Sequence, residues 1–153
     1  MAGTRSISRH EWIAVAGGAL LALAVFLPWY ATSKTNRNAN IDGVRGALSA
    51  WEAHPILRWI FLAAAIAPFV LTYIIIRGHQ LSWPRGEVTA VLGISAAVLV
   101  LYVGIVSKPG EPSGEISLRP GWFLGLIGCA LMFMGSAVRA SEFERPRKPP
   151  GTI

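Results

Sequence analysis

The side chains best suited to chemistry gather in one polar segment that separates two long apolar stretches. It contains the carboxylates of Asp42 and Glu52 and the imidazole of His54. A carboxylate and an imidazole can act together as general acid and base. No nucleophile or motif spacing accompanies them, so solvated charges beside a membrane explain the segment as well. The charged cluster as a whole consists of Asp42, Arg45, Glu52, His54 and Arg58.

We therefore predict no catalytic residue and treat the segment as a candidate interaction surface. The three histidines lie in separate polar segments and cannot form one metal site. Cys129 is the only cysteine, which excludes an intrachain disulfide and a CxxC motif. We expect no metal and no cofactor. The interaction residues that we predict are Asp42, Arg45, Trp51, Glu52 and His54.

Long stretches without Asp, Glu, Lys or Arg make up most of the remaining chain. Charged residues account for 14% of the sequence, against about 25% in soluble proteins, so too few charges remain to cover a water-exposed surface. Each stretch reaches the roughly 20 apolar residues that a helix needs to cross a bilayer. The first is longer than the apolar core of a signal peptide, which favours an uncleaved span. We predict transmembrane helices over about 12–30, 57–77, 88–106 and 121–138.

Small residues recur at helical spacing and indicate how these helices pack. Glycine and alanine let helix backbones approach closely, and lipid supplies no hydrophobic force that would associate helices otherwise. The spacing serves either packing within the bundle or docking of a partner on one face. Pro68, in the second span, predicts a kink because it removes a backbone hydrogen bond. The packing residues that we predict are Gly18, Gly93, Gly121 and Gly125.

The polar side chains inside the predicted spans are hydroxyls and one thiol. Ionisable groups within a membrane usually mark proton relays, ion pathways or gating charges. A proton-coupled pump or small multidrug exporter needs a buried carboxylate, so the sequence argues against these classes. Hydroxyls can bond back to their own helix, which explains them structurally. The polar residues are Thr72, Tyr73, Thr89, Ser95, Tyr102, Cys129 and Ser136.

The longest connection, residues 31–57, predicts a short amphipathic helix on the membrane surface. Its apolar residues fall at helical spacing with polar residues between them, at Ile41, Val44, Leu48 and Trp51. The alternative is an irregular loop whose apolar side chains pack against the bundle. We expect residues 108–120 to form a loop without regular structure. The composition of residues 139–153 predicts a disordered basic tail.

The distribution of basic residues sets the expected orientation. Four crossings place both termini on one side, and the 14 Lys and Arg residues divide into 8 on that side and 6 on the other. The positive-inside rule then makes both termini cytoplasmic in the cell membrane. Basic residues at helix ends meet anionic headgroups, so the net charge of +6 indicates a lipid bilayer and not nucleic acid as partner.

Three short motifs lie near the ends of the predicted spans, namely Leu27, Pro28, Trp29 and Tyr30; Ser49, Ala50, Trp51, Glu52 and Ala53; and Gly121, Trp122, Phe123, Leu124 and Gly125. They resemble motifs of a family of small four-span integral membrane proteins common in actinobacteria. The resemblance covers most of the chain in layout, although similar proteins often have Gly where this chain has Ala50. It implies a cell-membrane location, but the family has no agreed activity to carry over.

We therefore expect an all-α membrane protein, an antiparallel bundle of four transmembrane helices with a short amphipathic helix in the first extracytoplasmic loop. Packing motifs without chemistry favour a non-enzymatic accessory or scaffold subunit of a cell-envelope complex, which binds a membrane protein or a second copy of itself. The alternative is a lipid or small-molecule carrier with a cleft beside Pro68, lined by Thr72, Tyr73 or Tyr102. A third hypothesis is an enzyme that uses Asp42 and His54.

Overall fold

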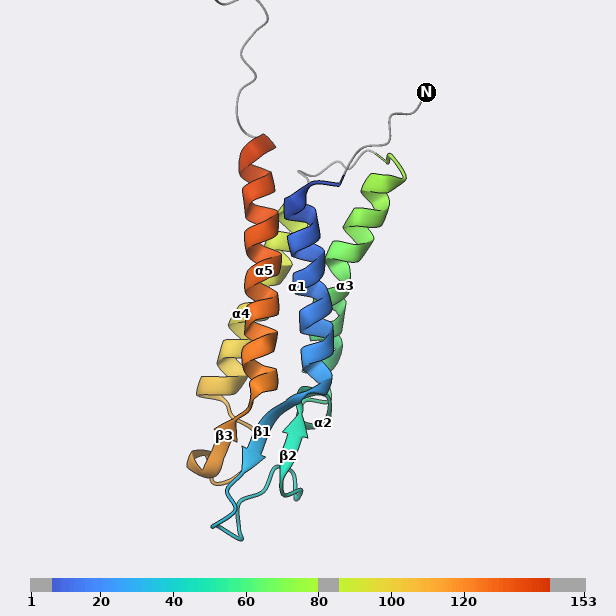
Figure 1. The fold of residues 1–153 in the computed structure, drawn as a ribbon. Coiled ribbons are helices and arrows are strands. Elements are labelled where there is room, and N and C mark those ends of the chain that lie inside the picture. The colour runs from blue at the N-terminus through green and yellow to red at the C-terminus, as the bar shows by residue number, and fades with distance from the viewer. Residues whose placement is uncertain (1–6, 80–85, 144–153) are drawn as a thin grey trace, which may run out of the picture.

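Four long helices form a bundle with a small sheet at one end. The structure, a computed structural model, describes residues 7–79 and 86–143. Within these ranges, four helices are long and apolar enough to cross a membrane. Figure 1 shows them side by side, and the start of α1 and the end of α5 lie away from the sheet. The helices are α1 (Arg9–Phe26), α3 (Leu57–Ile76), α4 (Glu87–Leu101), which continues into the π-helix η1 (Tyr102–Val106), and α5 (Pro120–Phe143).

Local sequence signals define both ends of α1. The Ser8 hydroxyl accepts a hydrogen bond from the backbone N–H of Glu11 at 3.3 Å, and the Glu11 carboxylate accepts one from the backbone N–H of Ser8 at 2.7 Å. This reciprocal pair is a capping box. At the other end, Pro28 disfavours a helical residue before it, and Leu27 is extended with φ −85° and ψ 157°. The first predicted span was therefore wrong at its end, because residues 28–30 belong to strand β1 (Pro28–Thr32).

Helix α1 packs most extensively against α5 and also contacts α3. The closest approaches lie at glycines. A Cβ atom on Gly17 would lie 2.6 Å from the carbonyl oxygen of Gly128 in α5, and one on Gly18 would lie 2.5 Å from that of Ala65 in α3. Between α4 and α5, a Cβ atom on Gly93 would lie 3.0 Å from the backbone nitrogen of Phe133. Backbone contact of this kind is possible only where no side chain intervenes.

Pro68 lies inside α3, which runs as one helix from Leu57 to Ile76. Its side chain is fully buried. The Pro68 ring packs on Gly18 of α1, where its Cγ would lie 2.7 Å from an added Cβ atom. The proline thus fills the space that the small residue of α1 leaves open.

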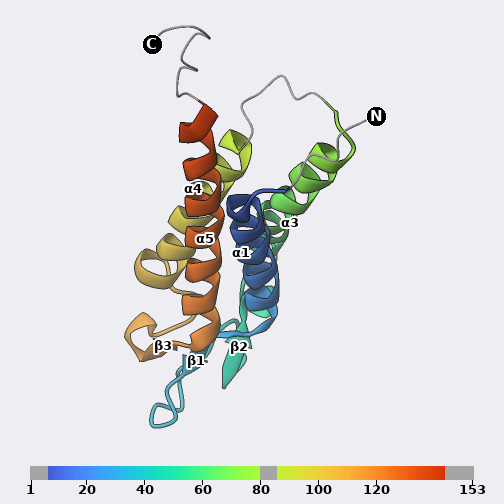
Figure 2. The ribbon, with the colours of Figure 1, turned by 45° about the horizontal axis from the view of Figure 1, so that its top comes forward.

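A three-stranded antiparallel sheet covers one end of the bundle, in the order β2-β1-β3. Strand β2 is Ala47–Ser49 and strand β3 is Ile116–Leu118. Tyr30 of the central strand pairs with Leu48 on one side and Leu118 on the other. The expectation of an all-α fold was therefore incomplete. We call residues 28–54 and 107–119 the cap, and Figure 2 shows it beyond the helix ends from a second direction.

The predicted amphipathic helix over residues 41–52 was wrong. Ile41 and Val44 instead pair with each other across a tight turn. Asp42 and Gly43 have φ of 49° and 80°, and Gly46 has φ of 113°. These left-handed conformations interrupt a right-handed helix. The only helical part of this segment is the single turn α2 (Ala50–Ala53).

Two other boundaries also differ from expectation. Residues 108–120 are not irregular throughout, because they contain the short 3₁₀ helix η2 (Ser113–Glu115) and strand β3. Helix α5 continues to Phe143, so the first residues of the predicted disordered tail are helical. The rest of that tail, residues 144–153, lies outside the described residues.

Candidate functional site

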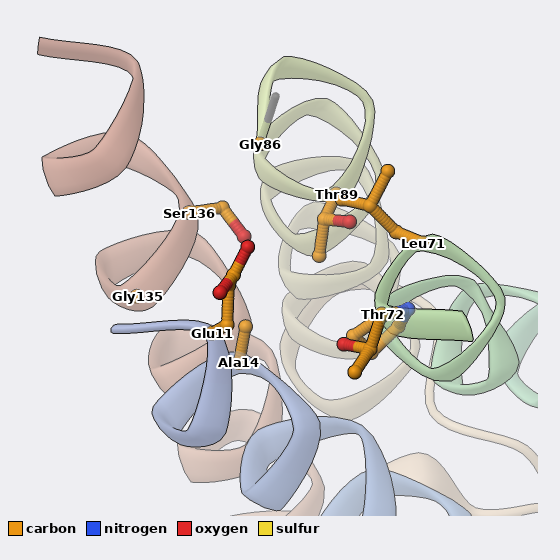
Figure 3. A pocket seen from close by; sticks show the side chains of 9 residues that line it. Glu11, Ala14, Leu71, Thr72, Gly86, Thr89, Gly135 and Ser136 are labelled. Atoms are coloured by element: carbon orange, nitrogen blue, oxygen red, sulfur yellow. The ribbon is translucent and has the colours of Figure 1, made fainter. Parts of the chain in front are cut away.

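A small cavity with a mostly apolar lining lies between all four long helices, at the end of the bundle away from the cap. Each helix contributes one oxygen-bearing side chain to its lining: Glu11 from α1, Thr72 from α3, Thr89 from α4 and Ser136 from α5. Figure 3 shows the Glu11 carboxylate and the Ser136 hydroxyl pointing toward each other, with Thr89 and Thr72 on neighbouring helices. The cavity volume of about 20 Å³ corresponds to roughly one water molecule.

Glu11 is the residue of this cavity that sequence reasoning missed. The first span was predicted to begin at residue 12, which left no carboxylate in any span. The helix begins instead at Arg9 and buries Glu11, whose side chain is only 7% exposed. The signal that could have revealed it was the spacing of Ser8 and Glu11, which is typical of a capping box and moves the helix start back by one turn.

The hydroxyl of Thr89 faces the same cavity. Thr89 is 1% exposed, and its Oγ1 has no hydrogen-bond partner among the residues that the structure describes. A buried hydroxyl without a partner costs about 1–3 kcal/mol relative to one that is hydrogen-bonded. Within the described ranges, no group of three His, Cys, Asp or Glu residues is arranged to hold a metal ion.

At the other end of the bundle, two of the three short sequence motifs meet at Trp29. The Trp29 side chain is fully buried, and its Nε1–H donates a 2.7 Å hydrogen bond to the carbonyl of Ala24. Two predicted packing residues lie against it. A Cβ atom on Gly121 would lie 2.5 Å from the carbonyl of Pro28, and one on Gly125 would lie 2.9 Å from the Trp29 ring. These glycines therefore admit the indole between α5 and the cap.

The end of α4 receives side-chain hydrogen bonds from two of these motifs. Trp122 Nε1–H donates to the carbonyl of Val100 at 2.8 Å, and the Tyr30 hydroxyl donates to the carbonyl of Val103 at 3.2 Å. The second acceptor lies in η1, where the backbone turns are wider than in an α-helix. Tyr30 holds this irregular end of α4 against the cap, and Trp122 holds it against α5.

Tyr30, which is fully buried, and His54, which is partly buried, form a polar pair within the cap. The hydroxyl of Tyr30 and Nε2 of His54 are 2.8 Å apart. Burial raises the pKa of Tyr30 above its ordinary value. Burial also lowers the pKa of His54, and the negative charge of Asp42 opposes this shift. The pair therefore favours the neutral forms of both side chains.

The predicted interaction residues do not assemble into one acid–base site. Both capping hydrogen bonds to Glu52 come from Ser49, with its backbone N–H at 2.9 Å and its hydroxyl at 2.8 Å. These bonds lower the pKa of Glu52. His54 is engaged by Tyr30, and Trp51 lies beneath the guanidinium of Arg58 at 4.4 Å. Two members remain exposed in the turns before β2, namely Asp42 and Arg45.

An open groove on the cap brings Arg45 together with two other cations. The groove has a volume of about 420 Å³ and runs along the end of β1 and the start of β2. Lys34 and Arg119 complete its basic lining, which contains no acidic side chain. Among residues 7–79 and 86–143, none of these three cations forms an ion pair. We call this surface the basic groove; its lining is Ala31, Thr32, Ser33, Lys34, Arg45, Gly46, Ala47 and Arg119.

The chain offers two candidate sites, the small cavity between the helices and the basic groove on the cap. What these two sites can do is therefore inferred from their geometry. Comparison of the chain with protein-family models, with curated proteins and with solved structures finds no match.

Proposed function

We propose that this chain is an integral protein of the cell membrane, with four crossings, both termini in the cytoplasm and the cap outside. In this orientation it acts as a non-enzymatic accessory or scaffold subunit of an envelope complex. The four apolar helices support insertion, since each is long enough to cross a bilayer. Many of their large apolar side chains point away from the bundle, as lipid contact requires; examples are Leu23, Val70, Val91, Val98 and Met134.

One observation carries the scaffold role, namely the ordered cap. Segments far apart in the sequence, at residues 28–32, 47–49 and 116–118, pair into one sheet. Ile41 and Ile116 are fully or almost fully buried within it. Short connections between transmembrane helices do not need a core of their own. A folded cap on a closely packed bundle therefore supports presentation of a fixed surface to another molecule.

The carrier hypothesis finds less support in this geometry. A cavity does lie beside Pro68 and Thr72, but its volume of about 20 Å³ is far below the roughly 300–1,000 Å³ of ligand pockets. The side chains of Tyr73 and Tyr102 are 57% and 51% exposed on the outside of the bundle. Carriage of a lipid between the helices would thus require a conformation in which they separate.

An enzyme at the outer charged cluster is also less well supported. Glu52 caps α2, and His54 is hydrogen-bonded to a buried tyrosine. The hydroxyls beside them are that of Ser49, which is engaged in the capping box, and that of the buried Tyr30. The likeness to small four-span actinobacterial proteins stays a prediction, and the scaffold role rests on the cap alone.

Insertion and orientation can be tested by cysteine labelling in intact cells. Cys129 is fully buried, so a Cys129→Ser variant supplies the background. We expect a membrane-impermeant maleimide to label Gly114→Cys, in the exposed η2 segment, and to leave His79→Cys unlabelled until the cells are opened. Labelling of both positions in intact cells, or release of the protein from membranes by carbonate at high pH, would contradict the proposal.

The scaffold role can be tested by crosslinking in cells and purification of the tagged full chain in mild detergent. We expect a defined membrane-protein partner or a second copy of the chain to co-purify. The capture should weaken when the cap is altered by Ile41→Asp and persist with Val44→Asp, because Ile41 is buried and Val44 is 52% exposed. A lone monomer with no captured partner would contradict the proposed role.

A further inference from the structure

We propose that the basic groove of the cap is an anion-binding site that takes a phosphate group. This inference deepens the proposed function and rests on it for the position of the cap outside the membrane. The phosphate could belong to the headgroup of an anionic lipid or to a soluble phosphate compound. Both share the chemistry that the groove recognises.

The sheet places the three cations of the groove along one strand. Because β1 and β2 are antiparallel, with Ala31 opposite Ala47, Lys34 beyond β1 and Arg45 before β2 lie at the same end of the strand pair. Arg119 follows β3 and directly precedes α5, and its backbone N–H donates to the carbonyl of Trp29 at 2.7 Å. It therefore stands at the bundle end of β1. The groove carries positive charge at both of its ends.

This charge is not compensated by the protein. The cap contains four carboxylates, but none of them lines the groove, and Glu52 is occupied by Ser49. Like charges gathered in one hollow repel each other and focus a positive potential. A bound anion removes the repulsion. The register of the sheet holds the three cations together despite it.

Phosphate suits these particular side chains. An arginine presents several N–H donors in a planar fork that matches the oxygens of a phosphate, and a lysine adds a compact charge with three further donors. The position of Arg119, directly before Pro120 of α5, puts one guanidinium where the chain leaves the apolar part of the bundle. In a membrane this is the depth of the headgroup phosphates.

The test measures binding to the purified full chain in neutral detergent, with two probes. One is inorganic phosphate, and the other is short-chain phosphatidylglycerol, compared with the corresponding diacylglycerol, which has no phosphate. We expect Arg45→Gln and Arg119→Gln each to weaken probe binding by about fivefold or more, since charge-assisted hydrogen bonds are lost. The matched control is Arg37→Gln, which removes the same charge from an exposed position outside the groove and leaves binding within about twofold.

The two probes distinguish the source of the phosphate. Binding of phosphatidylglycerol that inorganic phosphate does not displace supports the site and assigns it to a lipid headgroup. Displacement by inorganic phosphate at similar concentrations supports the site and assigns it to a soluble ligand. Both affinities should fall as salt is added, because the groove is open to solvent.

Three outcomes would overturn the proposal. The first is unchanged binding in both groove variants, and the second is an equal loss with Arg37→Gln. The third is binding of a glutamate-rich peptide, lost in the groove variants, when neither phosphate probe binds. Circular dichroism of each variant checks that the fold is intact. Failure here leaves partner capture by crosslinking unaffected, so it is distinguishable from failure of the scaffold role.

Discussion

The hydroxyl of Tyr30 lies 2.8 Å from Nε2 of His54 and 3.2 Å from the carbonyl oxygen of Val103. A hydroxyl has one proton to donate, and a carbonyl can only accept. Both contacts are satisfied together when the Tyr30 proton is donated to Val103 and the hydroxyl accepts from His54. In that arrangement the neutral imidazole is the tautomer with its proton on Nε2. One tyrosine thus links the central strand of the cap, the residue after α2 and the end of α4.

Removal of the Tyr30 hydroxyl should destabilise the cap. We expect Tyr30→Phe to lower the free energy of unfolding by about 1–3 kcal/mol, because buried partners lose their hydrogen bonds. Denaturant unfolding in detergent, followed by tryptophan fluorescence, measures the change. The control is Tyr102→Phe, since Tyr102 is 51% exposed, and it should change stability by less than about 0.5 kcal/mol. Equal effects of the two substitutions would contradict the linking role of Tyr30.

Acid should destabilise the protein through His54. Burial holds the pKa of its imidazole below the ordinary value of 6.5, so the unfolded chain binds more protons between these two values. The contribution of His54 to the free energy of unfolding is complete above about pH 6.5. It decreases as the pH falls from there to the pKa of His54 in the folded protein, and it stays constant below that pKa. Melting temperatures between pH 8 and pH 4 measure this, with His54→Gln expected to flatten the curve.

The substitution Asp42→Asn can be measured in the same pH series. The charge of Asp42 opposes the shift of the pKa of His54, so Asp42→Asn should lower that pKa further. The fall in stability would then extend to lower pH before it levels off. A shift of the curve in the opposite direction would show that Asp42 does not act on the imidazole.

Close helix contact should make Gly17 intolerant of a side chain. A Cβ atom there would lie 2.6 Å from both the carbonyl oxygen of Gly128 and the backbone nitrogen of Met132. We expect Gly17→Val to destabilise the bundle by about 1–3 kcal/mol or to prevent its folding, since backbone cannot move aside cheaply. Gly114→Val is the control, because nothing lies within 4 Å of its added Cβ. The melting temperatures of the two variants in detergent measure the difference, and equal stability would contradict the close packing at Gly17.

A different prediction concerns the hydroxyl of Thr89. Valine has nearly the same shape, and the hydroxyl has no hydrogen-bond partner among the described residues. We therefore expect Thr89→Val to leave stability unchanged or to raise it by up to about 1 kcal/mol. The comparison is Ser49→Ala, which removes a helix cap and should cost about 1 kcal/mol. A clear loss with Thr89→Val would mean that this hydroxyl is hydrogen-bonded within the cavity.

The helices were predictable from sequence because their signal is long. About 20 apolar residues without charge predict a helix long enough to cross a membrane, whatever surrounds them. The sheet was not, since β2 and β3 contain three residues each. So short a strand has no periodicity of its own. The pairing of Tyr30 with Leu118 depends on helices that bring the two segments together, which no local pattern records.

The candidate sites were predictable only in part, because their residues also come from segments that are far apart in the sequence. Arg45 was singled out within a run of charges, but its neighbours in the groove, Lys34 and Arg119, come from other segments. Glu52 and His54 were read as one cluster from their proximity in sequence. The capping box and the buried tyrosine direct them to different partners. Glu11 lay one residue outside a predicted boundary.

The cap also joins the long helices to one another at one end of the bundle. Strand β1 continues directly from α1, β3 leads into α5, and β2 leads through α2 into α3. Tyr30 of β1 and Trp122, near the start of α5, hold the end of α4 beside them. The four long helices are therefore held together at the sheet end. Any separation of the helices would be smallest there and largest at the opposite end, around Glu11 and Ser136.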